Sequence, residues 1–164
     1  MQILIKIIIL GVGATAIMDM LGHVRNILLG IKSLDYSIVG RWILSWHDRK
    51  FFHPNIWASP KKRQEKTVGW LAHYLIGVIW VSILIFVQNS WLDKPDFISA
   101  MILAAITSLF PFLLMQPAFG LGLFACKTTR PIKSIINTLI SHFFFGVGIF
   151  FTGKLFYWIN HYLS

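Results

Sequence analysis

The sequence predicts an all-α, polytopic membrane protein in which four transmembrane helices form an antiparallel bundle and a short interfacial helix lies in the first loop. Two observations predict this fold class. First, 56% of the 164 residues are hydrophobic and only 13% are charged, whereas a soluble domain carries nearer a quarter. Second, four apolar stretches are close to the roughly 20 residues that a helix needs to cross the hydrocarbon layer. The length favours a single transmembrane domain over residues 1–164.

The first predicted span covers residues 3–21. Its apolar run starts without a preceding basic region and continues past any plausible cleavage site, so we expect it to be retained rather than removed as a signal peptide. Gly11 and Gly13 provide small residues for close helix packing. Gly30 is expected to end the helix, because a glycine commonly follows the last helical residue.

Residues 31–67 form one long polar loop. Four of its apolar residues recur at helical spacing, namely Ile38, Trp42, Ile43 and Trp46. This pattern favours a short amphipathic helix in the membrane interface, with its tryptophans at headgroup depth. Pro54 and Pro60 argue against a continuous helix in the remainder.

The other three spans are predicted at residues 68–88, 97–119 and 134–157. The linker between the second and third spans is short, which favours antiparallel neighbours. Pro111 lies inside the third span and should kink it.

The distribution of lysine and arginine predicts the orientation. Nine of them lie between the first and second spans, three between the third and fourth, and only Lys94 between the second and third. The positive-inside rule therefore places the first and third loops in the cytoplasm and both termini in the periplasm. We expect the basic first loop to bind anionic lipid headgroups. The bilayer interface already accounts for these charges, so no nucleic-acid partner is expected.

Five polar side chains are predicted to lie in the inner half of the bilayer: Asp19, His23, His73, Gln116 and His142. The orientation puts all five toward the cytoplasmic ends of their helices. If their helix faces turn inward, they form one ligand-binding pocket open to the cytoplasm. Ionisable groups inside a membrane usually face the protein interior and mark functional sites.

Each residue has an alternative, structural interpretation. Asp19 is a candidate proton acceptor or counter-ion, and with His23 it could instead be a hydrogen-bonding pair at a helix end. His73 and His142 are candidate ligand contacts, or they form hydrogen bonds between helices. Gln116 is a candidate hydrogen-bonding partner, or a packing residue. Two facing histidines could also hold a haem, but no close ligand spacing supports a metal or cofactor, and the cofactor stays unknown.

His47, Asp48 and His53 match no metal-site template, so a solvated loop is expected there. The glycines near residue 11 lie within a span and lack the lysine of a phosphate-binding loop. The chain has no GxSxG elbow and no HExxH motif. These absences argue against hydrolytic or acyl-transfer chemistry, so the sequence leans toward a protein that is not an enzyme.

Several segments resemble an uncharacterised family of bacterial inner-membrane proteins, a domain of unknown function. They are GVGATAIMDML, LGIKSLDYSIVGRW, GWLAHYLIGV, PFLLMQPAFGLG and SHFFFGVG. The resemblance implies a four-span protein of the bacterial inner (cytoplasmic) membrane. It implies no substrate, cofactor or catalytic residue.

The leading hypothesis is a membrane protein that binds, and could transport, a small hydrophobic or amphiphilic ligand in the cytoplasmic-side pocket. Four spans are few for a transporter, so a homodimer is expected. One alternative is a membrane redox enzyme or transferase that uses the same histidines. The other is an accessory subunit of a larger membrane complex.

Overall fold

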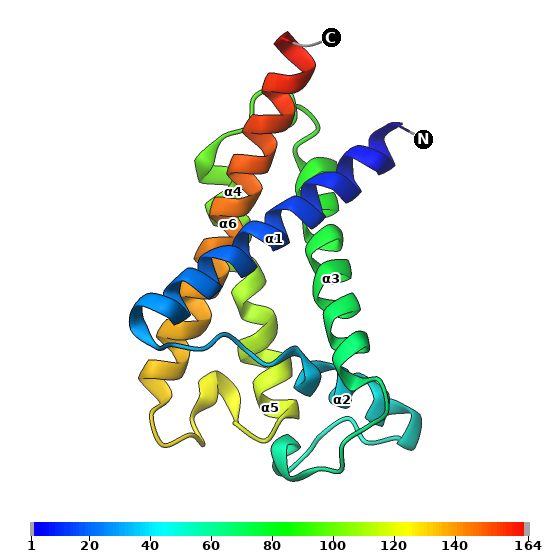
Figure 1. The fold of residues 1–164 in the computed structure, drawn as a ribbon, viewed down its shortest axis with the longest axis vertical. Coiled ribbons are helices and arrows are strands. Elements are labelled where there is room, and N and C mark those ends of the chain that lie inside the picture. Colours follow the sequence, from blue (N-terminus) through cyan, green and yellow to red (C-terminus); the bar gives the residue numbers. More distant parts are fainter. Residues whose placement is uncertain (1, 163–164) are drawn as a thin grey trace. The chain divides into compact units, whose positions relative to one another are not determined.

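The computed structural model describes residues 2–162, which are mostly helical and contain no β-strand (Figure 1). Four helical stretches are long and apolar enough to cross a membrane, at Ile3–Leu29, Glu65–Val87, Phe97–Ala118 and Pro131–Tyr162. The predicted all-α class and the four helices of membrane-spanning length are therefore confirmed. The elements are α1 (Gln2–Leu29), α2 (Tyr36–Ser45), η1 (Trp46–Asp48), η2 (Ile56–Ala58), α3 (Glu65–Val87), α4 (Phe97–Phe110), η3 (Pro111–Met115), α5 (Gln116–Ala118), η4 (Leu123–Ala125) and α6 (Pro131–Tyr162).

The first and last long helices extend beyond the predicted spans. α1 continues to Leu29, and α6 begins at Pro131, where the missing N–H of proline is harmless because a first-turn N–H has no partner within the helix. Hydropathy marks only the apolar part of a helix, so it does not include polar end turns. Gly30 has a φ of 67° and donates its N–H to the carbonyl of Asn26 at 2.9 Å, which confirms that it ends α1.

The third spanning stretch changes its helical type at Pro111. Instead of a simple kink, η3 is a π-helical turn of five residues, and the N–H of Gln116 bonds to the carbonyl of Pro111. Proline removes one backbone donor, and its ring presses on the preceding turn. A π turn is wider than an α turn and relieves that contact.

The chain divides into two compact units. Unit 1 holds residues 1–33, 74–107 and 141–164, and unit 2 holds residues 34–73 and 108–140. The two units share α3, α4 and α6, whose residues are divided between them.

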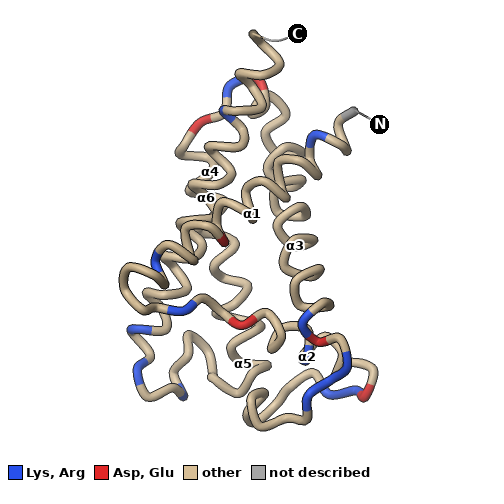
Figure 2. The backbone as a smooth tube through the Cα atoms, in the orientation of Figure 1, with Lys and Arg blue, Asp and Glu red and all other residues tan. Residues whose placement is uncertain are grey.

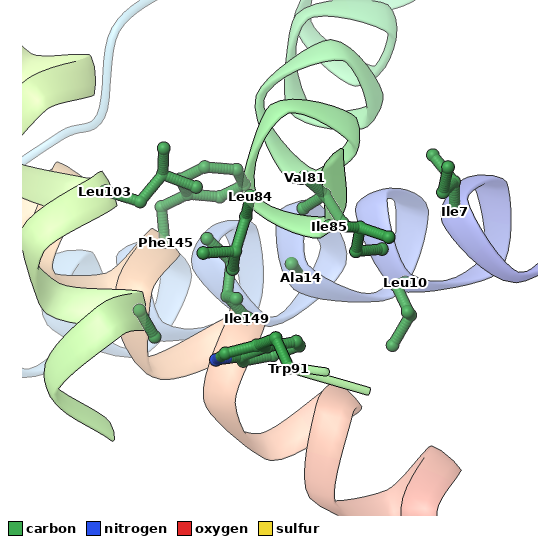
Figure 3. Packing of buried hydrophobic residues seen from close by; sticks show 11 residues of the cluster. Ile7, Leu10, Ala14, Val81, Leu84, Ile85, Trp91, Leu103, Phe145 and Ile149 are labelled. Atoms are coloured by element: carbon green, nitrogen blue, oxygen red, sulfur yellow. The ribbon is translucent and has the colours of Figure 1, made fainter. Parts of the chain in front are cut away.

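The core of unit 1 draws on all four long helical stretches. Figure 3 shows Ile7, Leu10 and Ala14 of α1 with residues of α3 and α6. The remaining buried members of this cluster are Val81, Leu84, Ile85, Trp91, Ala100, Leu103, Phe145 and Ile149.

Glycines let the helices of unit 1 approach closely. A Cβ added at Gly11 would lie 2.5 Å from the Cα of Val78, and one added at Gly148 would lie 2.3 Å from the carbonyl oxygen of Ala14. Both distances are too short for any side chain. The predicted role of the α1 glycines in close packing is confirmed.

Unit 2 is built around α2, which confirms the short helix predicted in the first loop. Asp35 caps it by accepting a hydrogen bond from the N–H of Ser37 at 2.9 Å. Trp42 was expected at headgroup depth, but it is only 3% exposed and its indole N–H bonds to the carbonyl of Phe51 at 2.8 Å. The apolar face of α2 packs on the protein's own core because the irregular segment after it folds back. Only η2 interrupts that segment, as the two prolines predict.

Arg41 holds α2, α3 and this segment together. Its Nε and Nη2 donate to the two carboxylate oxygens of Glu65, each at 2.8 Å. Its Nη1 donates to the carbonyls of Ile56 and Ser59 at 3.2 and 3.1 Å. The arginine is 4% exposed. The hydrogen bond to Glu65 raises the pKa of Arg41 above its usual value, against the effect of burial, so the guanidinium stays charged.

Candidate intramembrane polar site

Asp19 lies on the part of α1 that packs against α3 in unit 1. It is half-buried, and the hydroxyl of Tyr74 hydrogen-bonds to its carboxylate. Thr15, one turn earlier, is 1% exposed and donates to the carbonyl of Gly11 at 2.8 Å. A carboxylate is therefore present inside a helix of membrane-spanning length, with a phenol as its neighbour.

His23 does not continue this face. It is exposed, whereas Gly22 and Arg25 are buried. Residues four apart on an α-helix are rotated by about 40°, so a stripe that starts at Gly11 has turned by about 120° when it reaches His23. His23 therefore lies away from the buried face of α1 that carries Thr15.

His142 lies on α6 in unit 1 and contacts Thr107 of α4. Its Nδ1 is 2.7 Å from the Thr107 hydroxyl oxygen. That hydroxyl donates its one hydrogen to the carbonyl of Ala104 at 2.8 Å, so it accepts from the ring. The contact therefore assigns the Nδ1–H form to His142.

Gln116 belongs to unit 2 and follows the π turn directly. It is 7% exposed, and its amide nitrogen donates to the Thr138 hydroxyl at 3.4 Å. The Thr138 hydroxyl in turn donates to the carbonyl of Ser134 at 3.0 Å. The amide oxygen of Gln116 is buried and has no hydrogen-bond partner in the structure. This side chain therefore retains an unused acceptor inside a spanning helix.

His73, also in unit 2, belongs to an aromatic cluster. Its ring stacks on Tyr36 with centroids 3.9 Å apart, and Trp70 meets it edge-on at 5.9 Å. These contacts place His73 at the junction of α2 and α3. Through these contacts, a residue of α3 packs against α2, the helix of the first loop.

The five predicted site residues are thus divided between the units, with Asp19, His23 and His142 in unit 1 and His73 and Gln116 in unit 2. The contacts described pair four of them with residues outside the predicted set. Tyr74, Thr107 and Thr138 were not predicted as partners, because hydroxyl residues are common in such helices and no local pattern distinguishes these three. Their role depends on which helices become neighbours.

The loop histidine His53 was expected to be solvated, but the structure buries it at 7% exposure. Its backbone N–H bonds to the carbonyl of Ala118 at 2.8 Å, and its Nδ1 lies 3.0 Å from the Ser59 hydroxyl. Burial lowers the pKa of His53, and the backbone carbonyl of Lys50 opposes that shift. Among residues 2–162, no three His, Cys, Asp or Glu side chains gather as a metal site.

Basic residues are frequent in the segment between α2 and α3, where Figure 2 colours the backbone blue. They are Arg49, Lys50, Lys61, Lys62 and Arg63. Lys62 pairs with Asp48, and this pairing lowers the pKa of the Asp48 carboxyl.

The four apolar helices define a multi-pass membrane protein. A family model described as a protein of unknown function, DUF2938, matches residues 8–156, so the chain belongs to that family. This confirms the resemblance to an uncharacterised family. No curated protein and no solved structure matches the chain.

Proposed function

We propose that this membrane protein binds a small amphiphilic molecule through polar side chains on its spanning helices, and that it does not act as an enzyme. One observation carries the proposal. The amide of Gln116 is buried, is held at its nitrogen by Thr138, and has an oxygen without a partner.

The physical argument concerns the cost of that oxygen. A buried acceptor without a donor costs about 1–3 kcal/mol, and the hydrocarbon layer offers no water to satisfy it. A hydroxyl or amine on a ligand would satisfy it, and an apolar tail on the same ligand suits the surrounding helices. π turns such as η3 are frequent at functional sites.

The other predicted residues are proposed as polar ligand contacts within their own units. In unit 2, His73 is a polar contact beside Gln116 in the sequence-predicted set. In unit 1, Asp19 is the proton acceptor or counter-ion for a ligand amine, and His142 and His23 are polar contacts. Movement of the ligand or its proton between leaflets would use the same groups.

We further propose that the protein lies in the inner membrane of a bacterium, with loops one and three in the cytoplasm and both termini in the periplasm. The strong bias of lysine and arginine toward these loops supports this orientation. Reporter fusions at Lys62 should report a cytoplasmic position, and fusions at Leu92 a periplasmic one. The opposite pattern would refute the orientation and the cytoplasmic side of the site.

The proposed partners are the bilayer itself, anionic headgroups at the basic first loop, and a second copy of the chain in a homodimer. Native mass spectrometry of gently solubilised protein would measure the dimer directly. Its absence at every mild detergent condition would remove the dimer from the proposal.

The same measurement tests the ligand. We expect the wild-type protein to retain a small molecule that Gln116→Met loses, because methionine keeps the volume and removes the amide. Thr138→Val is the matched control, since it removes the contact at the amide nitrogen and leaves the amide oxygen. Equal retention by wild type and Gln116→Met, or no retained molecule in the wild type, would contradict the proposal.

A further inference from the structure

Arg25 lies on the buried stripe of α1 in unit 1. Ala14, Met18, Gly22 and Arg25 follow one another at spacings of four, four and three residues, so they share one helix face. Ala14 is fully buried, and Met18 packs against the unit 1 core. Arg25 is only 7% exposed. Its side chain therefore lies on the face that packs inside the protein.

The guanidinium of Arg25 has unused donors. Its Nε and Nη1 are buried and have no hydrogen-bond partner. The ring of Phe144 on α6 lies 5.9 Å from the guanidinium carbon and attracts the cation, but it leaves these N–H groups without an oxygen acceptor. The ion pairs found among residues 2–162 join Arg41 to Glu65 and Lys62 to Asp48, and neither includes Arg25.

An arginine side chain keeps its positive charge in proteins. A buried charge without a counter-ion is strongly unfavourable, and arginine inside a spanning helix is among the most costly residues. Its planar fork of donors matches the oxygens of a phosphate group in a bidentate arrangement. The site therefore needs an anion, and phosphate oxygens suit its geometry.

The surroundings fit a headgroup. Arg25 lies near the end of α1, at about 6 Å of helix rise from Leu29, since each residue advances the helix by 1.5 Å. The chain turns back after Gly30, and the hydroxyl oxygen of Ser33 lies 2.7 Å from where a Cβ of Gly22 would be. Gly22 is one turn from Arg25 on the same face. Ser33 is exposed and can supply a second donor.

We propose that Arg25, aided by the Ser33 hydroxyl, binds the phosphate group of an anionic amphiphile at the end of α1. This site uses none of the five residues proposed to contact the ligand of the proposed function. It therefore stands or falls independently of ligand binding at Gln116.

The test compares two lipids that differ only in their phosphate. Native mass spectrometry of the full chain in mild detergent would measure binding of dioleoyl phosphatidic acid and of dioleoylglycerol, with inorganic phosphate as a third probe. We expect the wild type to prefer phosphatidic acid and Arg25→Gln to lose that preference by about 10-fold to 100-fold, the range for a charge-assisted hydrogen bond. Lys94→Gln is the matched control, because it removes an exposed lysine of the same unit that lies outside the basic first loop.

Two further measurements identify the source of the bound phosphate group and control for misfolding of the variants. Competition by inorganic phosphate at equal affinity identifies a free-anion site, while binding of phosphatidic acid alone identifies a lipid headgroup. Arg25→Lys keeps the charge and removes the fork, so it should show a smaller loss, and it decides the question if Arg25→Gln does not fold. Equal binding of the two lipids by the wild type, an unchanged preference in both Arg25 variants, or an equal loss in Lys94→Gln would overturn the proposal.

Discussion

Replacing Arg41 by methionine should strongly destabilise unit 2. The substitution keeps much of the side-chain volume and removes four donated hydrogen bonds, two to the Glu65 carboxylate and one each to the carbonyls of Ile56 and Ser59. The side chains of Arg41 and Glu65 are 5% and 13% exposed, so water replaces little of what is lost.

The size of the stability loss follows from the Glu65 charge, which Arg41→Met leaves buried without its partner. Removing one partner of a buried ion pair typically costs about 3–5 kcal/mol, mainly because the other charge remains buried and uncompensated. For a chain of this length, 1 kcal/mol corresponds to about 2–4 °C in Tm. Arg41→Met should therefore lower the Tm by about 6–20 °C.

The assay is thermal unfolding of the detergent-solubilised protein, followed by circular dichroism, for the wild type, Arg41→Met, Glu65→Gln and the double variant. The double variant should be more stable than the sum of the single losses predicts, because it leaves no unpaired charge. Additive losses, or a loss below about 1 kcal/mol, the level of an exposed pair, would refute the reasoning.

Three further outcomes are expected in the same assay. Gly40→Ala should destabilise by about 1–3 kcal/mol or more, the usual cost of overpacking, because its Cβ would lie 1.8 Å from the carbonyl oxygen of Glu65. Since burial lowers the pKa of His53, its neutral form stabilises the fold at pH 7, and this contribution is lost as the pH falls through the ordinary histidine pKa of about 6.5. The Tm advantage of the wild type over His53→Asn should therefore shrink between pH 7 and pH 5. Thr107→Val should cost about 0.6–2 kcal/mol, the range for a hydrogen bond between membrane helices, because it removes the acceptor for His142.

Matched control substitutions separate these specific contacts from other causes of lost stability. Gly30→Ala meets no atom within 4 Å but has a positive φ, so it should cost only the conformational strain of about 1 kcal/mol. Thr152→Val removes a hydroxyl that bonds only within its own helix, and it should cost less than Thr107→Val. A loss for Gly40→Ala no larger than for Gly30→Ala would contradict the close approach of α2 and α3. A pH-independent difference for His53→Asn would contradict the burial of a neutral imidazole.

Local patterns predicted much of the fold. Apolar stretches of spanning length predicted the four long helices, the spacing of Ile38, Trp42 and Ile43 predicted α2, and Gly30 predicted the end of α1. The candidate site was harder to predict than the fold, because its residues were grouped only by their depth in the membrane and by their spacing along single helices. Spacing of four drifts around the helix, which is why His23 is exposed and Arg25 is buried.

The sequence by itself determined that this chain is a multi-pass membrane protein of an uncharacterised family, since hydropathy and helix length depend only on the order of residues. The tertiary structure alone decided which polar groups meet. Arg41 with Glu65 and Gln116 with Thr138 are 24 and 22 residues apart, and no local pattern connects them. It also left Nε and Nη1 of Arg25 and the Gln116 oxygen without hydrogen-bond partners, because burial and pairing arise only when helices pack against one another.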